Sequence, residues 1–253
     1  MKNKTEIGII GFGNFGKFIA KHLKNKAEIV VTDNVDKSKE ADELGIKFST
    51  LDEVLKRKII ILAVPMENFV ETLHKIKNKL QEGSLVIDVC SLKMFSCKAM
   101  LEILPKNIEI IGTHPLFGPQ SAREGIKGMK IVLCNVKAED KTFQKVKKFC
   151  EELGLKVITS TAEEHDKQMA VSQALTHFVG QALKNINIKR VEMSTKTFDD
   201  LMNIMEIIKN DTKKLFENMQ TMNPFAEEIR KKFIKEAEKI NAQLNSKSRR
   251  KTR

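Results

Sequence analysis

A glycine-rich turn near the start of the chain constrains its fold more than any other feature. The apolar run at residues 6–10 leads into Gly-Phe-Gly-Asn-Phe-Gly at residues 11–16, and a helix-like pattern follows over residues 17–23. A second apolar run at residues 28–32 ends at Asp33. This order of strand, glycine turn, helix, strand and acid predicts a βαβ unit that can bind a dinucleotide.

Each glycine of the turn has its own physical role. Gly11 permits the tight turn, Gly13 lets the backbone approach a pyrophosphate, and Gly16 lets the helix pack closely on the strand. The charge of the pyrophosphate meets unpaired N–H groups at the helix start. The predicted cofactor-binding residues, including three at the carboxyl end of a later apolar run, are Gly11, Phe12, Gly13, Asn14, Phe15, Gly16, Asp33, Ala63, Val64 and Pro65.

The acid at the end of the second run bears on the choice of cofactor. Asp33 is predicted to accept hydrogen bonds from the ribose hydroxyls. A carboxylate there repels a 2′-phosphate, so the sequence favours NAD over NADP. Lys37 and Lys39 follow closely and can soften this repulsion, which keeps NADP as an alternative.

Length and composition indicate a soluble globular protein. The chain has 253 residues, of which 41% are hydrophobic and 31% charged, enough for one large or two ordinary domains. No stretch approaches the roughly 20 apolar residues of a membrane span, and no signal-peptide pattern precedes the first strand. We expect a cytoplasmic protein without a membrane partner. The cysteines are expected to be reduced, mostly buried thiols; they are Cys90, Cys97, Cys134 and Cys150.

The formal net charge of +12 raises the question of a nucleic-acid partner. Five basic residues lie within the last seven positions, and the rest of the excess is spread over helix faces with little aromatic interleaving. This pattern predicts a basic disordered tail over residues 246–253 and no nucleic-acid partner.

Apolar runs and helical patterns alternate well beyond the first unit. The expected strands are 59–64, 85–89, 108–112, 131–134 and 157–158, and the expected helices are 66–80, 92–104 and 141–153. Continuous apolar runs suit strands buried on both faces. The predicted fold class is α/β, with a Rossmann-type doubly wound parallel sheet in a dinucleotide-binding domain at residues 1–158.

The remainder of the chain is predicted to be helical. Helical patterns lie near 162–189, 196–219 and 223–245, so residues 159–245 are expected to form a helical domain for substrate binding and dimerisation. Broad apolar faces without a sheet to cover favour a homodimer through this domain.

Candidate catalytic residues follow the strands, because ligands of such sheets bind at the carboxyl ends. His114 follows a buried strand directly, and Pro115 and Pro119 stiffen the loop around it, so we expect it to act in chemistry. Ser91 holds the equivalent position after the preceding strand. It is predicted either to hydrogen-bond a substrate hydroxyl or the nicotinamide amide, or to cap the next helix.

Further polar residues have two alternative roles each. Lys93 and Arg123 can hold a substrate carboxylate or lie in solvent, and His177 can face the substrate from the helical domain or lie in its core. No chemistry is expected of the remaining three histidines, which are His22, His74 and His165.

Five parts of the sequence together match one family pattern: the glycine turn and segments 88–93, 113–119, 164–170 and 173–177. The most specific of them is His-Pro-Leu-Phe-Gly-Pro at 114–119. In these parts the chain resembles the prephenate and arogenate dehydrogenases of tyrosine biosynthesis, and the resemblance spans nearly the whole chain. Segment 195–198 and Asn223-Pro224 make the plant arogenate dehydrogenases look closest.

This resemblance implies an NAD(P)-dependent oxidative decarboxylation of a cyclohexadienyl substrate. His114 matches the catalytic histidine that accepts the proton of the ring hydroxyl, Ser91 matches the serine that contacts this hydroxyl and the nicotinamide, and His177 matches a substrate-side histidine. Many members carry an arginine for a substrate carboxylate, which segment 194–197 lacks; Lys196, Lys93 or Arg123 are its candidate replacements.

Several alternatives stay open. The sequence does not distinguish prephenate from arogenate as the substrate. A dehydrogenase of another small acid is a further enzymatic alternative, and an NAD-binding sensor without turnover is a non-enzymatic one.

Overall fold

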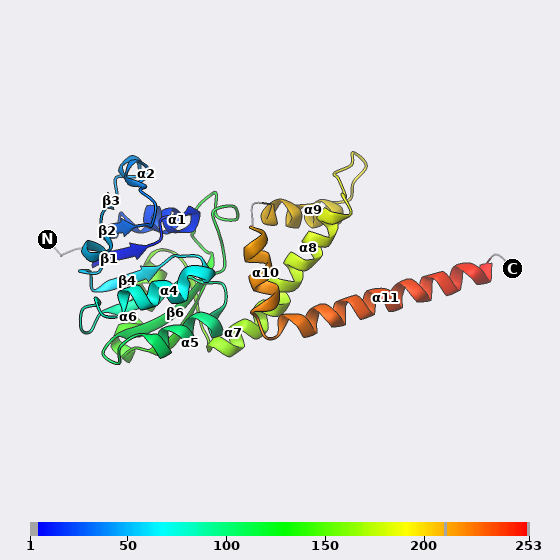
Figure 1. Cartoon of the computed structure of the whole chain (residues 1–253). Helices are drawn as coiled ribbons and strands as arrows, with labels where there is room; N and C mark the ends of the chain where they lie inside the picture. Colours follow the sequence, from blue (N-terminus) through cyan, green and yellow to red (C-terminus); the bar gives the residue numbers. More distant parts are fainter. Residues whose placement is uncertain (1–4, 210–211, 252–253) are drawn as a thin grey trace. The chain divides into compact units, whose positions relative to one another are not determined.

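The computed structural model describes residues 5–209 and 212–251, and the chain divides into two compact units, residues 1–165 and 166–253 (Figure 1). The predicted domain boundary at 158/159 falls inside strand β8 (Lys156–Thr159), so the first unit also includes the start of the following helix. Within the described residues, no helix combines the length and the apolar character needed to cross a membrane.

The described part of the first unit contains one sheet of eight strands. The strands are β1 (Thr5–Ile10), β2 (Ala27–Thr32), β3 (Lys47–Phe48), β4 (Ile59–Leu62), β5 (Leu85–Asp88), β6 (Glu109–Pro115), β7 (Lys130–Lys137) and β8. Their order is β3-β2-β1-β4-β5-β6-β7-β8, so the order reverses between β1 and β4. Ligands of doubly wound sheets bind at this reversal, outside the carboxyl ends of the strands.

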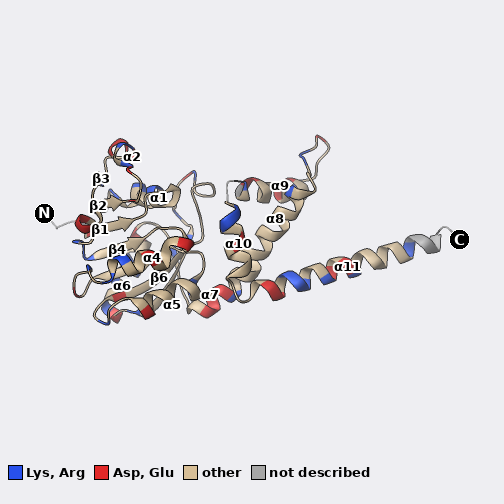
Figure 2. Cartoon of the chain, viewed as in Figure 1, with Lys and Arg blue, Asp and Glu red and all other residues tan. Residues whose placement is uncertain are grey.

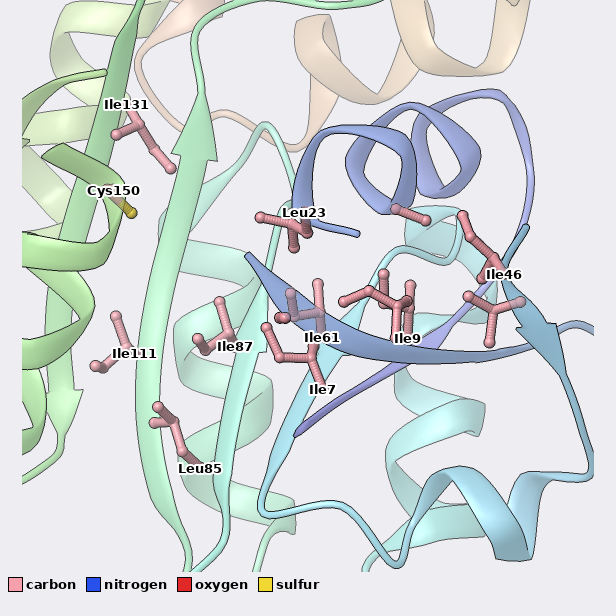
Figure 3. Packing of buried hydrophobic residues seen from close by; sticks show 14 of the residues in the cluster. Ile7, Ile9, Leu23, Ile46, Ile61, Leu85, Ile87, Ile111, Ile131 and Cys150 are labelled. Carbon is pink, nitrogen blue, oxygen red and sulfur yellow. The ribbon is translucent and has the colours of Figure 1, made fainter. Parts of the chain in front are cut away.

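The central strands β4 and β5 are buried on both faces, as their continuous apolar runs predict, whereas β8 at the edge of the sheet is mostly exposed. On one face Ile7 and Ile9 of β1 belong to a core cluster with Leu23 and Ile61 (Figure 3). The alternate residue of β4, Ile60, points to the other face and is also fully buried. The helices of this unit are α1 (Asn14–Leu23), α2 (Ser38–Glu43), α3 (Leu51–Val54), α4 (Met66–Ile76), α5 (Lys93–Ile103), α6 (Asp140–Glu152) and the start of α7 (Ala162–Met169).

The sheet is mostly parallel, and the β6–β7 pair is the exception to the predicted parallel arrangement. β7 pairs antiparallel with β6, with Val132 opposite His114 and Leu133 opposite Thr113, and β8 then pairs parallel with β7. The connection between them, residues 116–129, contains no helix. A parallel pair needs a long crossover, usually helical, whereas an irregular connection can return the chain antiparallel to its neighbour.

The cysteines of the first unit are free thiols in the core, as predicted. Burial raises the pKa of Cys97 and of Cys150 to about 12. At neutral pH both thiols are therefore protonated, and a protonated thiol is a poor nucleophile.

The second unit is helical in its described residues. Its helices are the end of α7, the π-helix η1 (Ala170–Leu175), α8 (Thr176–Asn185), α9 (Lys196–Ile208), α10 (Lys213–Thr221) and α11 (Ala226–Lys251). Gly180 of α8 allows close packing on α9, since an added Cβ would lie 2.6 Å from Ile208 Cδ1.

Two helical predictions are corrected here. The pattern at 162–189 contains the π-helix and ends at Asn185, and the single helix predicted at 196–219 is two helices. The second of these starts where the Thr212 hydroxyl accepts from Leu215 N and caps the new helix. Residues 210–211 of that prediction lie outside the described part of the chain.

The predicted tail is also different, because α11 continues to Lys251 instead of ending near 245. Acidic and basic residues are interspersed along the exposed helix (Figure 2), and ion pairs one turn apart, such as Glu227–Lys231, support it. Residues 252–253 lie outside the described chain.

Candidate active site

The glycine turn joins β1 to α1 in the predicted way. Gly11 has φ +99°, and its N–H donates to Thr32 O at 2.9 Å. A Cβ at Gly11 would lie 2.5 Å from Ala63 O, and one at Gly16 would lie 2.0 Å from Gly11 O. The turn therefore contacts the end of β4, which brings Ala63 beside the glycines.

Gly13 differs from these two glycines. It is the N-cap of α1 and offers no side-chain capping bond, while an added Cβ would meet no atom within 4 Å. The space beside the helix start is thus open, and the first N–H groups of α1 have no side-chain cap. These are the conditions under which a helix N-terminus binds a phosphate group.

Replacing Gly13 by Ala is expected to weaken cofactor binding at least about tenfold, because the methyl group enters the space that a pyrophosphate needs. The fold is expected to persist, since this methyl group meets no protein atom. Gly16→Ala is the contrasting variant, because its methyl group collides with Gly11 O and should lower the melting temperature. Calorimetric titration with NAD and thermal unfolding measure the two effects. Unchanged NAD affinity in Gly13→Ala would contradict this placement.

Asp33 lies directly after β2, with its carboxylate against the glycine turn. It accepts from Phe12 N at 2.6 Å and Val35 N at 3.2 Å, and Lys37 Nζ lies 3.7 Å from Oδ2. Lys37 also donates to Phe12 O. The carboxylate is thus held in place beside the ammonium of Lys37. This lysine lies where it can reduce the repulsion between Asp33 and a 2′-phosphate, as the sequence predicts.

The other predicted cofactor residues lie around the same edge. Ala63 N donates to Ile10 O at 2.8 Å, and Pro65 is the N-cap of α4. Asn14 is exposed at the start of α1, whereas Phe15 is half-buried and stacks on Phe18. The structure therefore gathers the predicted residues at the carboxyl ends of β1, β2 and β4.

Lys93 and Asp88 form an ion pair whose two side chains are both completely buried. The Asp88 carboxylate also accepts from Cys90 N at 3.0 Å and Thr113 N at 3.2 Å. It therefore ties the end of β5 to β6. The sequence predicted Lys93 to contact a substrate carboxylate; because its side chain is buried and paired, we assign it this structural role instead.

Ser91 does not cap the helix that follows it. The N-cap of α5 is Leu92, without a side-chain capping bond, and Ser91 Oγ is buried with no hydrogen-bond partner among the described residues. A buried hydroxyl without a partner costs free energy unless a ligand supplies one. The structure thus removes the capping alternative and leaves the hydroxyl available to a ligand.

His114 lies on β6, and its ring is buried with 6% of the residue exposed. Its Nδ1 is 2.8 Å from Nε2 of His165, which is 2% exposed and lies in α7. Burial lowers the pKa of His114 well below its usual value, and the nearby His165 and Lys93 lower it further. His114 is therefore a neutral imidazole at physiological pH, as a general base must be.

His165 is the residue that sequence reasoning missed. Because it lies in the polar start of a helix, no chemistry is expected of it from the sequence, whereas the structure buries it against His114. Segment 164–170, in which the chain resembles known dehydrogenases, is the only sequence signal that includes it. The other two histidines without an expected role differ, since His74 is exposed and His22 contacts Phe18 O.

The remaining substrate candidates do not gather in one place. Arg123 is exposed in the loop after β6, donates to Gln120, and lines a polar hollow of about 430 Å³. His177, in α8, is half-buried, and Lys196 is exposed at the start of α9 with Asp200 as its ion-pair partner. The last two belong to the second unit, so their assignment to substrate binding stays a prediction.

Comparison with known proteins supplies the family. The sequence model described as "Prephenate dehydrogenase, nucleotide-binding domain" matches residues 15–159, more than half of the chain. The chain belongs to the prephenate dehydrogenase family. The model of the TYRAAT1-like C-terminal domain matches residues 182–253. The predicted resemblance is thus confirmed over both parts of the chain.

Relatives and solved structures agree with this family. Arogenate dehydrogenase 1 of Arabidopsis thaliana is 29% identical over 96% of this chain and 39% of its own length. A probable arogenate/prephenate dehydrogenase of Methanocaldococcus jannaschii is 31% identical over 98% of this chain and 59% of its own. The chain thus spans less than two thirds of the length of either relative.

Solved structures of family members share the fold. Prephenate dehydrogenase from A. aeolicus, solved with hydroxyphenyl propionate and NAD+, gives a TM-score of 0.79 at 24% identity, covering 97% of this chain and 92% of that one. Synechocystis arogenate dehydrogenase gives 0.75 at 18% identity, covering 96% and 93%. The predicted Rossmann-type domain followed by a helical one is therefore confirmed.

Proposed function

We propose that this chain catalyses the NAD(P)-dependent oxidative decarboxylation of prephenate or arogenate in tyrosine biosynthesis, with NAD as the favoured cofactor. The observation that carries this proposal is that a neutral buried imidazole, His114 on β6, and an unpartnered hydroxyl, Ser91 just after β5, occur at neighbouring strands. The two strands are parallel neighbours, with Asp88 opposite Gly112, so both residues belong to the same edge of the sheet.

The residues at the glycine turn fit a dinucleotide. The open space at Gly13 and the uncapped start of α1 suit the pyrophosphate, and Asp33 lies where the ribose hydroxyls are bound in such folds. When bound, the nicotinamide accepts the hydride from the substrate.

The side chains of this chain then handle the proton. The Nδ1 of His114 is hydrogen-bonded to His165, which leaves Nε2 to accept a proton. Nε2 takes the proton of the ring hydroxyl while hydride leaves the carbon that carries this hydroxyl. Ser91 Oγ positions this hydroxyl. Loss of the ring carboxylate as carbon dioxide makes the ring aromatic, and the proton returns from His114 to the phenolic oxygen, so the base is regenerated.

The decisive experiment follows the absorbance of the reduced nicotinamide with NAD or NADP and with prephenate or arogenate, each pair supplied separately. Turnover with one pair supports the proposal and assigns substrate and cofactor together. Absence of turnover in all four, with NAD binding intact, would instead favour the sensor or a dehydrogenase of another small acid. A cytoplasmic location stays a prediction from the sequence.

The proposed partners are a small-molecule substrate and a second copy of the chain, bound through the helical unit. Large apolar side chains are exposed along one helix, α11: Phe233, Ile234, Ile240 and Leu244, which are 40%, 41%, 55% and 59% exposed. Phe233, Ile240 and Leu244 follow one another at seven and four residues, which places them on one face of the helix, and such a face suits pairing with another helix.

We expect light scattering to give twice the chain mass of 28.8 kDa for the unmodified protein. Glutamates at both Ile240 and Leu244 should shift the protein to the monomer, because the charges would have to be buried in the interface. Leu101→Glu, at a site 51% exposed on α5, is the matched control and should stay dimeric. A monomer of the unmodified protein at working concentration would exclude this partner.

A further inference from the structure

The contact between the two buried histidines is built by the sheet itself. Val132 of β7 lies opposite His114 on one side and Ile158 of β8 on the other. β8 ends one residue later at Thr159, so the chain leaves the sheet close to the level of His114 and starts α7 there. His165 N donates to Thr161 O in the first turn of this helix. The position of His165 is thus set by the end of β8 and by the backbone of α7.

The geometry limits what the pair can do. Nδ1 of His114 and Nε2 of His165 lie 2.8 Å apart, and the ring planes meet at 67° with centroids 5.0 Å apart. Two nitrogens at this distance share one proton, so one ring donates and the other accepts. The partner therefore decides which nitrogen of His114 carries hydrogen.

We propose that His165 is a positioning residue, which accepts the Nδ1–H of His114 and thereby keeps Nε2 of His114 free of hydrogen. This inference rests on the proposed function, because a free Nε2 matters only if His114 acts as a base. A carboxylate orients the histidine of a catalytic triad in the same manner, and an incorrect tautomer there costs much of the rate. In this chain the imidazole of His165 takes the orienting role of that carboxylate.

The charges around the pair suit a neutral acceptor. The groups that face His114 are His165 from α7 and Lys93 from α5, whose ammonium is paired with Asp88 of β5. A second positive charge on His165 would repel both the imidazolium that forms during the reaction and Lys93. A neutral His165 can instead stabilise the transient charge on His114 by accepting a stronger hydrogen bond.

Two amide variants separate positioning from packing. In His165→Gln the terminal oxygen can reach the position of Nε2 and still accept, whereas the shorter amide of His165→Asn cannot. We expect His165→Asn and His165→Leu to lower kcat about 100-fold with KM and NAD affinity unchanged, and His165→Gln to recover most of the rate. His74→Gln, at an exposed histidine of α4, is the control. Equal losses in Gln and Asn would overturn the proposal.

A second measurement does not depend on turnover. Long-range proton–nitrogen NMR spectra of the protein, labelled at its five histidines, report which ring nitrogen carries hydrogen. We expect His114 to carry hydrogen at Nδ1 in the unmodified protein and in His165→Gln, and to change tautomer in His165→Leu. Hydrogen at Nε2 of His114 in the unmodified protein would overturn the inference. If the tautomers are as expected but no substrate turns over, the proposed function fails and the positioning stands.

Discussion

His114→Asn is expected to lower kcat by about 10²- to 10⁴-fold, the usual contribution of a general base, while NAD affinity stays unchanged. Asparagine keeps a polar group near the position of Nδ1 but offers no nitrogen that can take a proton at the position of Nε2. The glycine turn and Asp33 lie on other strands and should keep their geometry. Stopped-flow measurement of nicotinamide reduction and calorimetric titration with NAD separate the two effects.

The same residue predicts the pH dependence. Because burial, His165 and Lys93 hold the pKa of His114 well below 6.5, the imidazole is already neutral at pH 6.5 and above. The contribution of His114 to kcat/KM should therefore be constant above this pH and fall only as the pH approaches the lowered pKa from above. A rate that rises through pH 6.5 to 7.5, as with an unperturbed histidine, would contradict the buried geometry.

His74→Asn provides the matched control for the base. This histidine is exposed in the last turn of α4 and should tolerate the change without loss of rate. If His114→Asn and His74→Asn retain the same turnover, His114 is not the base and the proposed chemistry must be reassigned. If His114→Asn loses NAD binding together with turnover, its role is structural.

Lys93→Met is expected to lower the free energy of unfolding by about 3–5 kcal/mol, the cost of leaving one charge of a buried pair without its partner. The Asp88 carboxylate would then keep only its neutral backbone donors, including Cys90 N and Thr113 N, in a fully buried site. The double variant Asp88→Asn/Lys93→Met removes both charges and should recover part of the loss. Urea denaturation followed by circular dichroism measures these differences.

Lys98→Met on the same helix is the control for Lys93→Met. Its ammonium lies 3.8 Å from Glu102 and its side chain is 75% exposed, so the pair contributes little and the change should stay within about 0.5 kcal/mol. Equal unfolding free energies for the Lys93 and Lys98 variants would contradict a structural role for the buried pair. They would return Lys93 to the candidates for substrate binding.

The sequence alone determined the elements whose signals are local. The glycine turn, the acid after the second strand and the continuous apolar runs depend on steric demands and burial that a few neighbouring residues reveal. The predicted strands 59–64 and 85–89 are found at Ile59–Leu62 and Leu85–Asp88. His114 could be predicted as a catalytic candidate for the same reason. A residue at the carboxyl end of a parallel strand lies at the edge of the sheet where ligands bind, whatever the position of its strand in the sheet.

Only the tertiary structure decided which side chains meet. His165 is 51 positions from His114 in the sequence, and a short β8 beside an antiparallel β7 brings the two rings together. The burial of Lys93 likewise depends on Asp88, β6 and the surrounding core. Contacts between distant segments follow from strand order and direction, which local periodicity does not encode. A charge or an imidazole gains its pKa and its role from that environment and not from its neighbours in the chain.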